Sequence, residues 1–277
     1  MIFFSNAKIN IGLNIINKRA DGYHNIESIF YPVKWCDVIE ILPAKRFELI
    51  NYGNKINCNI ETNLCYKAFK LIKEHYSIPD IKIILYKNIP TESGLGGGSS
   101  NASTVLKGLN KFFKLNITKK ELLMFAQKIG SDCSFFIINK PSFIKGKGDI
   151  LEPANINLSQ YYCVIIKENV SISTKWAYSL INEYEHQNIK AIIENYPVSE
   201  WKYHLKNDFE KYILKHFPIL LEIKNWLYQN NALYASLTGS GSAIYGIFKD
   251  KPNLQLNKYQ FFWTGKLTLN FLDDTQL

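Results

Sequence analysis

The sequence lacks the features that mark metalloproteins, disulfide-rich proteins and membrane proteins. Its five cysteines are odd in number and form no CxxC pair, which argues against a zinc site and a disulfide framework. Its five histidines show no HExxH or HxH spacing, so we expect no metal held by protein ligands alone. No apolar run approaches the roughly 20 residues of a membrane span, and the N-terminus lacks the pattern of a secretory signal. These absences predict a soluble cytoplasmic protein with no membrane partner.

The chain also lacks a dense block of basic residues, although its formal net charge is +9. This charge favours anionic ligands, either nucleic acid or small phosphorylated molecules. A nucleic-acid-binding module would concentrate its lysines and arginines in one stripe with aromatics. The lysines are instead spread along the chain, so we expect no nucleic-acid partner and keep an RNA-binding module as the alternative from a different class.

Hydrophobic periodicity predicts an α+β fold in two parts. Alternation over 8–15 predicts a strand with apolar residues on one face and Lys8, Asn10 and Asn14 on the other. Further strands are expected at 26–33, 37–42, 47–52, 81–86, 161–167, 232–237 and 243–248, and helices at 61–75, 119–129, 175–185 and 218–230. The turn-rich segment after Pro153 predicts a boundary between an N-terminal domain, 1–153, and a C-terminal domain, 154–277.

The glycine-rich stretch 90–104 carries the strongest functional signal. Its four glycines, at 94 and 96–98, permit backbone conformations that bring several N–H groups toward one point. Apolar residues follow at helical spacing, so a helix is expected to start at Ser99 or Ser100 with its unpaired N–H groups facing the loop. This arrangement predicts a phosphate-binding site rather than an ordinary flexible loop. It matches neither the P-loop, because no Gly-Lys-Ser/Thr follows, nor GxGxxG, because residue 99 is Ser.

Three further features are each compatible with a structural or a functional role. Lys8 is either a solvated strand lysine or part of a ligand-facing surface. Asp132 follows a helix end, where capping is the commoner role, but a kinase would use such a carboxylate to accept the proton of a substrate hydroxyl. The loop 238–242, Thr-Gly-Ser-Gly-Ser, is either a hairpin turn or a second ligand-binding loop.

Five segments together resemble the GHMP kinases, the family that includes galactokinase, homoserine kinase and mevalonate kinase. They are KINIGLN at 8–14, RADGYH at 19–24, GLGGGSSNA at 94–102, GSDCSFF at 130–136 and TGSGSA at 238–243, and two shorter matches are Ser173-Thr174 and Asn207-Asp208. They occur in the family's order and cover essentially the whole chain. The resemblance implies a two-domain GHMP kinase fold, with an N-terminal ribosomal-protein-like β-α-β domain and a C-terminal ferredoxin-like α/β domain.

The resemblance also implies roles for particular residues. Asp132 would be the catalytic base and Lys8 its electrostatic partner, with ATP and Mg²⁺ as cofactors. ATP would lie along the glycine loop. The implied ATP-binding residues are Pro90, Ser93, Gly94, Leu95, Gly96, Gly97, Gly98, Ser99 and Ser100.

Within the family, the motifs are most similar to the members that phosphorylate the 2-hydroxyl of 4-(cytidine 5'-diphospho)-2-C-methyl-D-erythritol in the non-mevalonate isoprenoid pathway. Tyr23, His24 and Tyr178 would then frame the cytosine. The implied substrate-binding residues are Asn10, Tyr23, His24, Thr174, Tyr178, Gly239 and Ser240. The alternative is a GHMP kinase of homoserine or mevalonate type. The binding site of such a kinase would need no aromatic ring or imidazole, because its alcohol substrate carries no nucleotide base.

Two segments depart from the family pattern. Thr91-Glu92-Ser93 stands where relatives have small, glycine-rich residues, and it places an acid beside the phosphate loop. Cys133-Ser134 replaces the usual Val-Pro after the aspartate. Neither departure removes a residue with an expected chemical role.

Overall fold

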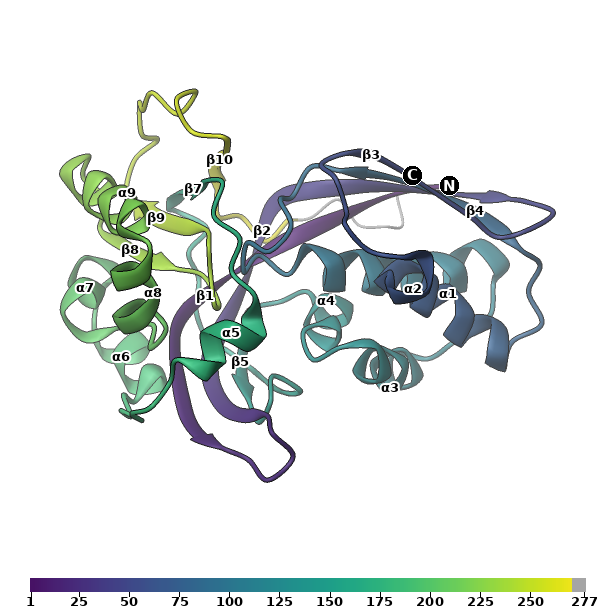
Figure 1. The fold of residues 1–277 in the computed structure, drawn as a ribbon, viewed down its shortest axis with the longest axis horizontal. Coiled ribbons are helices and arrows are strands. Elements are labelled where there is room, and N and C mark those ends of the chain that lie inside the picture. Colours follow the sequence, from purple (N-terminus) through teal and green to yellow (C-terminus); the bar gives the residue numbers. More distant parts are fainter. Residues whose placement is uncertain (271–277) are drawn as a thin grey trace.

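The computed structural model describes residues 1–270, and its first half is organised by a six-stranded sheet (Figure 1). The strands follow the order β3-β4-β2-β5-β6, and β1 pairs with β2. Their bounds are β1 (Ile2–Lys18), β2 (His24–Pro43), β3 (Glu48–Gly53), β4 (Ile81–Lys87), β5 (Ser142–Lys145) and β6 (Ile150–Pro153). The pair β1 and β2 is much longer than the other strands, so it reaches from the N-terminal helices to the second half of the molecule.

The long strand β2 corrects the expectation of two separate strands at 26–33 and 37–42. The strand is continuous because β1 pairs with it along nearly its whole length, from Lys18↔His24 to Ile2↔Glu40. Register shifts interrupt the alternation of β1 at three places, including one beside Gly12, which has a φ of 65°. Lys8, Asn10 and Asn14, expected on a polar face of this strand, are all buried, whereas Asn17 and Lys18 at its end are exposed.

Four helices cover one face of the first sheet: α1 (Leu64–His75), α2 (Gly97–Phe113), α3 (Lys119–Ile129) and α4 (Cys133–Ile138). A short 3₁₀ turn, Ile60–Thr62, precedes α1. The expected helix 119–129 is confirmed, with reciprocal capping bonds between Thr118 and Glu121. The expected start of α2 at Ser99 or Ser100 is wrong by two to three residues, because Gly97 and Gly98 already form its first turn.

The second half contains a four-stranded antiparallel sheet in the order β10-β7-β9-β8. Its elements are β7 (Tyr162–Lys167), β8 (Tyr234–Leu237), β9 (Ile244–Phe248), β10 (Phe261–Lys266), α5 (Thr174–Ser179), α6 (Ile189–Asn195), α7 (Trp201–His204), α8 (Glu210–His216), α9 (Pro218–Gln229) and the 3₁₀ turn Val198–Glu200. The expected helix 175–185 is shorter than predicted, and α6, α7, α8 and β10 were not anticipated.

The expected domain boundary falls in the connection between the two sheets. The first sheet ends at Pro153 and the second begins at Tyr162, while 271–277, at the end of the expected second domain, lie outside the described residues. One apolar cluster crosses this connection, since Ile9 and Tyr31 share it with Ile165 and Tyr245. None of the helices within 1–270 is long and apolar enough to cross a membrane.

Candidate active site

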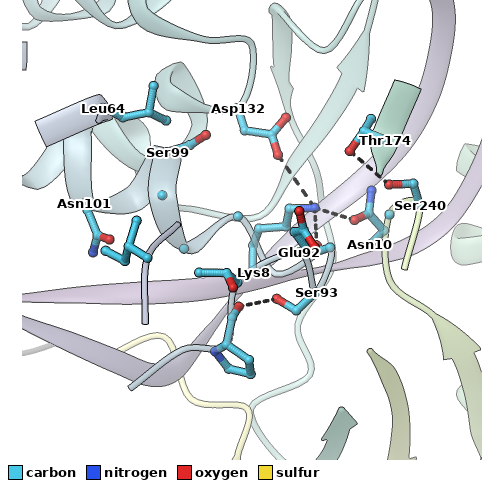
Figure 2. A pocket seen from close by; sticks show the side chains of 18 of the residues that line it. Lys8, Asn10, Leu64, Glu92, Ser93, Ser99, Asn101, Asp132, Thr174 and Ser240 are labelled. Atoms are coloured by element: carbon cyan, nitrogen blue, oxygen red, sulfur yellow. Dashed lines mark hydrogen bonds and ion pairs between the residues drawn. The ribbon is translucent and has the colours of Figure 1, made fainter. Parts of the chain in front are cut away.

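A cavity of about 410 Å³ lies where the glycine loop, β1, α5 and the loop after β8 meet (Figure 2). Its lining includes Lys8, Asn10, Asp132, Thr174, Tyr178, Gly239 and Ser240, together with Pro90, Ser93, Gly94 and 96–99. The fold therefore brings together residues that are up to 232 positions apart, from Lys8 to Ser240 (240 − 8 = 232). Two of the expected loop residues, Leu95 and Ser100, are buried behind this surface instead of lining it.

The glycine loop connects β4 to α2, and two of its glycines, Gly94 (φ 74°) and Gly96 (φ 71°), are left-handed. Gly96 is the residue before α2 and makes no side-chain cap bond, so the first N–H groups of this helix are left to the loop and the cavity. The helix is 17 residues long, and its N-terminal dipole favours an anion there. The backbone thus offers a phosphate site without any side chain.

The second glycine loop, 238–242, packs directly against the first. Thr238 Oγ1 donates to the carbonyl of Gly94 (3.2 Å), and Ala243 N donates to the carbonyl of Ser93 (3.1 Å). A Cβ at Gly94 would lie 2.0 Å from the carbonyl oxygen of Thr238. The two loops therefore form one wall of the cavity, and the loop at 238–242 is more than a hairpin turn.

Lys8 points from β1 into the floor of this cavity. Its Nζ donates to Asn10 Oδ1 (2.6 Å) and to the carbonyl of Gly94 (2.8 Å), and it lies 4.4 Å from the ring centre of Phe30. Burial lowers the pKa of the Lys8 ammonium, and the charge of Asp132 partly offsets this effect. Lys8 is thus buried beside the glycine loop and lines the cavity, so it is not a solvated strand lysine.

Asp132 approaches Lys8 from the opposite side of the cavity (Figure 2). Its Oδ2 lies 3.8 Å from Lys8 Nζ. Although Asp132 precedes α4, its side chain makes no capping hydrogen bond. The carboxylate is therefore available to a ligand, and the geometry does not support the capping role.

Tyr23, His24 and Tyr178, the residues expected to frame a base, do not all lie at the cavity. The rings of His24 and Tyr178 are stacked, with centroids 4.7 Å apart and planes 14° apart. Tyr178 lines the cavity, and burial raises its pKa and lowers that of His24. Tyr23 is 57% exposed, does not line the cavity and lies beside Lys147. The structure thus brings Tyr178 to the cavity and stacks His24 on its ring, although His24, like Tyr23, does not itself line the cavity.

Thr174 and Ser240 close the side of the cavity near α5. Their hydroxyl oxygens are 3.3 Å apart, which connects the start of α5 to the second glycine loop. Asn10 holds the same region together, because its N–H donates to Thr238 Oγ1 (3.1 Å) while its side-chain amide donates to Ser28 Oγ (3.0 Å).

Several lining residues were not anticipated. Asn63, Leu64 and Lys87 line the cavity on the far side of the glycine loop, and Phe30 lies beneath Lys8. The sequence offered one signal for Lys87, namely its position at the end of the strand that leads into the glycine loop. A lysine at a strand end is ordinarily a solvated charge, and only the fold shows that Lys87 is buried.

Glu92, the acid that departs from the family pattern, lies in the loop with a φ of 49°. Its carbonyl accepts from Ser242 N (3.3 Å), and its carboxylate acts on the buried Lys167, whose pKa is lowered by burial and raised in part by this charge. Glu92 is thus partly explained as a counter-charge for Lys167.

The family models for the N-terminal and C-terminal domains of GHMP kinases match residues 63–140 and 185–261. A 4-diphosphocytidyl-2-C-methyl-D-erythritol kinase of Azobacteroides pseudotrichonymphae genomovar. CFP2 is 45% identical, over 94% of this chain and 98% of its own. This chain belongs to the GHMP kinase family. A 4-diphosphocytidyl-2-C-methyl-D-erythritol kinase of Parabacteroides distasonis is 42% identical to this GHMP kinase, over 97% of this chain and 100% of its own.

Solved structures agree with this assignment. A crystal structure of 4-(cytidine 5'-diphospho)-2C-methyl-D-erythritol kinase superposes on this GHMP kinase with a TM-score of 0.81 and 25% identity, covering 96% of this chain and 98% of that chain. The mevalonate kinase of Methanococcus jannaschii shares the fold, with a TM-score of 0.69 and 15% identity, covering 95% and 97%. The expected α+β GHMP kinase fold is therefore confirmed.

Proposed function

We propose that this GHMP kinase transfers the γ-phosphoryl group of ATP to the 2-hydroxyl of 4-(cytidine 5'-diphospho)-2-C-methyl-D-erythritol, in the cytoplasm. The observation that carries the reaction is the pair formed by Lys8 and Asp132, 3.8 Å apart, beside a backbone phosphate site. The relatives at 41–45% identity that carry the name of this kinase support the substrate.

The chemistry needs one base and one fixed cation. The Asp132 carboxylate accepts the proton of the substrate hydroxyl while the hydroxyl oxygen forms a bond to the γ-phosphorus. The bond between the γ-phosphorus and the β,γ-bridging oxygen breaks, and ADP leaves with that oxygen. The Lys8 ammonium stabilises the negative charge on the transferred group. Because Lys8 is held by Asn10 and Gly94, it needs no rearrangement at the moment of transfer.

The same cavity fits Mg²⁺ as a companion of the nucleotide. Within 1–270 no group of three His, Cys, Asp or Glu could hold a metal, but Mg²⁺ is commonly bound by one or two carboxylates, water and the substrate's phosphates. The Asp132 carboxylate, just before α4, and the Ser99 hydroxyl, in the first turn of α2, both line the cavity and would supply oxygen ligands (Figure 2). When bound, Mg²⁺ neutralises charge on the phosphates.

Recognition of the cytidine rests on the stacked pair of His24 and Tyr178. An aromatic face in the cavity suits a flat base, and an imidazole behind it keeps that face in position. Thr174, Gly239 and Ser240 border the same side and would contact the rest of the substrate. Tyr23, which is exposed in the structure, would contact the base only after moving toward the cavity.

The decisive test is ATP consumption by the purified protein with three alcohols in parallel. We expect turnover with 4-(cytidine 5'-diphospho)-2-C-methyl-D-erythritol and none with homoserine or mevalonate. Omission of Mg²⁺ should abolish that turnover. Turnover with homoserine or mevalonate alone would refute the substrate assignment while leaving the kinase assignment intact.

A further inference from the structure

A buried carboxylate lies behind the glycine loop, outside the cavity lining. Asp37, on β2, is fully buried and accepts four hydrogen bonds. Its Oδ1 accepts from the backbone N–H groups of Asn88 (2.8 Å) and Ile89 (2.7 Å). Its Oδ2 accepts from Lys87 Nζ (2.6 Å) and from the side-chain amide of Asn101 (2.8 Å).

The four donors come from the two ends of the glycine loop. Ile89 immediately precedes Pro90, where the loop begins, and Asn101 lies in the second turn of α2, just after the loop ends. Hydrogen bonds to an ionised carboxylate are about twice as strong as neutral ones, and a buried carboxylate is costly unless such donors remain in place. A single side chain therefore ties the entry and the exit of the loop together.

Neighbouring residues extend this connection to the loop backbone. Lys87 Nζ also donates to the carbonyl of Ile89 (2.7 Å), and a Cβ at Gly97 would lie 2.9 Å from the same nitrogen. Ser5 Oγ accepts from the Asn101 amide (3.0 Å) and donates to Ser100 Oγ (2.8 Å). The first turns of α2 are thus fixed against both β1 and β4.

We propose that Asp37 is a positioning residue that holds both ends of the glycine loop so that its N–H groups converge on the phosphates of ATP. This proposal rests on the proposed function, in which the loop binds those phosphates. Asp37 does not line the cavity, so it acts through its four donors, on Lys87, Asn88, Ile89 and Asn101. Its removal should weaken binding of the phosphates and spare binding of the adenosine portion.

The test compares the affinities for ATP and adenosine in Asp37→Asn, measured by titration calorimetry. Asparagine presents an NH₂ group to donors that require an acceptor, so the loop loses part of its support. We expect the Kd for ATP to rise about tenfold, the effect of losing one strong hydrogen bond, and the Kd for adenosine to change less than about twofold.

The matched control is Asn110→Ala, at the other end of α2. Asn110 exchanges two hydrogen bonds with the backbone of Ile117 (2.9 and 3.0 Å), so its loss should lower the Tm without changing the ratio of the two affinities. Ser5→Ala, a milder change in the same network, should shift the ratio in the same direction as Asp37→Asn. It replaces Asp37→Asn if that variant does not fold.

An unchanged ratio in the folded Asp37→Asn variant, or in Ser5→Ala if it replaces that variant, would overturn the proposal. A wild-type protein that binds ATP no more tightly than adenosine would instead overturn the phosphate site itself. Neither measurement uses the alcohol substrate, so an error in the substrate assignment would not affect the test.

Discussion

At the scale of single residues, Asp132 tests the reaction most directly. Asp132→Asn keeps the shape of the side chain but removes its ability to accept a proton, so kcat should fall by about 10²- to 10⁴-fold. The Kd for ATP should stay close to the wild-type value, because in the proposed site the loop backbone binds the phosphates. Steady-state kinetics and calorimetry measure both quantities.

The matched control for this variant is Asp80→Asn. Asp80 is paired with Lys73, just before β4 and outside the cavity, so its loss should leave kcat unchanged. A near-normal kcat in Asp132→Asn would mean that Asp132 is not the base.

Asp208 gives a prediction for the dependence of stability on pH. Burial raises the pKa of this carboxyl to about 6, whereas an unfolded aspartate titrates near about 4. The folded chain therefore binds this proton more tightly than the unfolded chain, so the free energy of unfolding falls as the pH rises from about 4 to about 6. Asp208→Asn removes the buried charge and keeps an acceptor for Ile15 N, which now donates to Oδ2 (2.7 Å).

The variant should consequently be more stable than the wild type at pH 8. Because the carboxyl is partly exposed, we expect a gain of about 1 kcal/mol, or about 2–4 °C in Tm. The gain should vanish below about pH 3, where the carboxyl is protonated in both states. Thermal melts followed by circular dichroism at the two pH values measure this, and an equal Tm difference at both would contradict it.

At the scale of elements, the contact between the two glycine loops depends on Gly94. A Cβ there would overlap the Thr238 carbonyl at 2.0 Å, and the φ of 74° already disfavours alanine. Gly94→Ala should separate the loops, lower the stability by at least about 1 kcal/mol and weaken ATP binding. Thermal melts and calorimetry detect the two effects.

Gly98→Ala is the control for stability. Gly98 is helical, and its nearest neighbour for a Cβ is Leu64 Cδ1 at 3.6 Å, so alanine should be tolerated or should stabilise α2 by up to about 1 kcal/mol. Equal Tm losses in the two variants would show that the loop contact is unimportant.

The elements differ in how well their sequences predicted them. The helix α3 was predicted with its bounds because its signals, Thr118, Glu121 and Gly130, are local. The strand β2 was predicted in two pieces because its continuity depends on pairing with β1, which periodicity within β2 does not report. The short α5 and the unanticipated α6 to α8 lie in a segment whose structure depends on packing against the second sheet.

The same distinction applies to the site. The glycine loop is a local motif, so an anion-binding role could be proposed from its own residues. The choice between cap and base for Asp132 could not, because it depends on Lys8, 124 residues earlier (132 − 8 = 124). The stacking of His24 on Tyr178 likewise requires the fold, and so does the role of Asp37, because its four donors come from 87–89 and from Asn101.

At the scale of the whole molecule, the cavity depends on both sheets at once. Lys8 and Asn10 come from β1, whereas Gly239 and Ser240 follow β8 of the other sheet. The hydroxyl of Tyr245 donates to the carbonyl of Asn10 (2.7 Å), and Asp208 N donates to the carbonyl of Leu13 (2.9 Å). The long β1 therefore belongs structurally to both halves.

Because β1 contacts both halves, we expect that the proposed domains 1–153 and 154–277 do not fold independently. The fragment 1–153 would expose the faces of Ile9, Ile11 and Tyr31 that pack against Ile165 and Tyr245 in the intact chain. We expect the full chain to unfold in one calorimetric transition whose van't Hoff and calorimetric enthalpies agree, and the isolated fragment to bind ANS and show no cooperative melt. Two separate transitions would contradict this prediction, if Tyr245→Phe shifted only the transition at higher temperature. They would show that each half is stable alone and that the cavity forms when two folded domains dock.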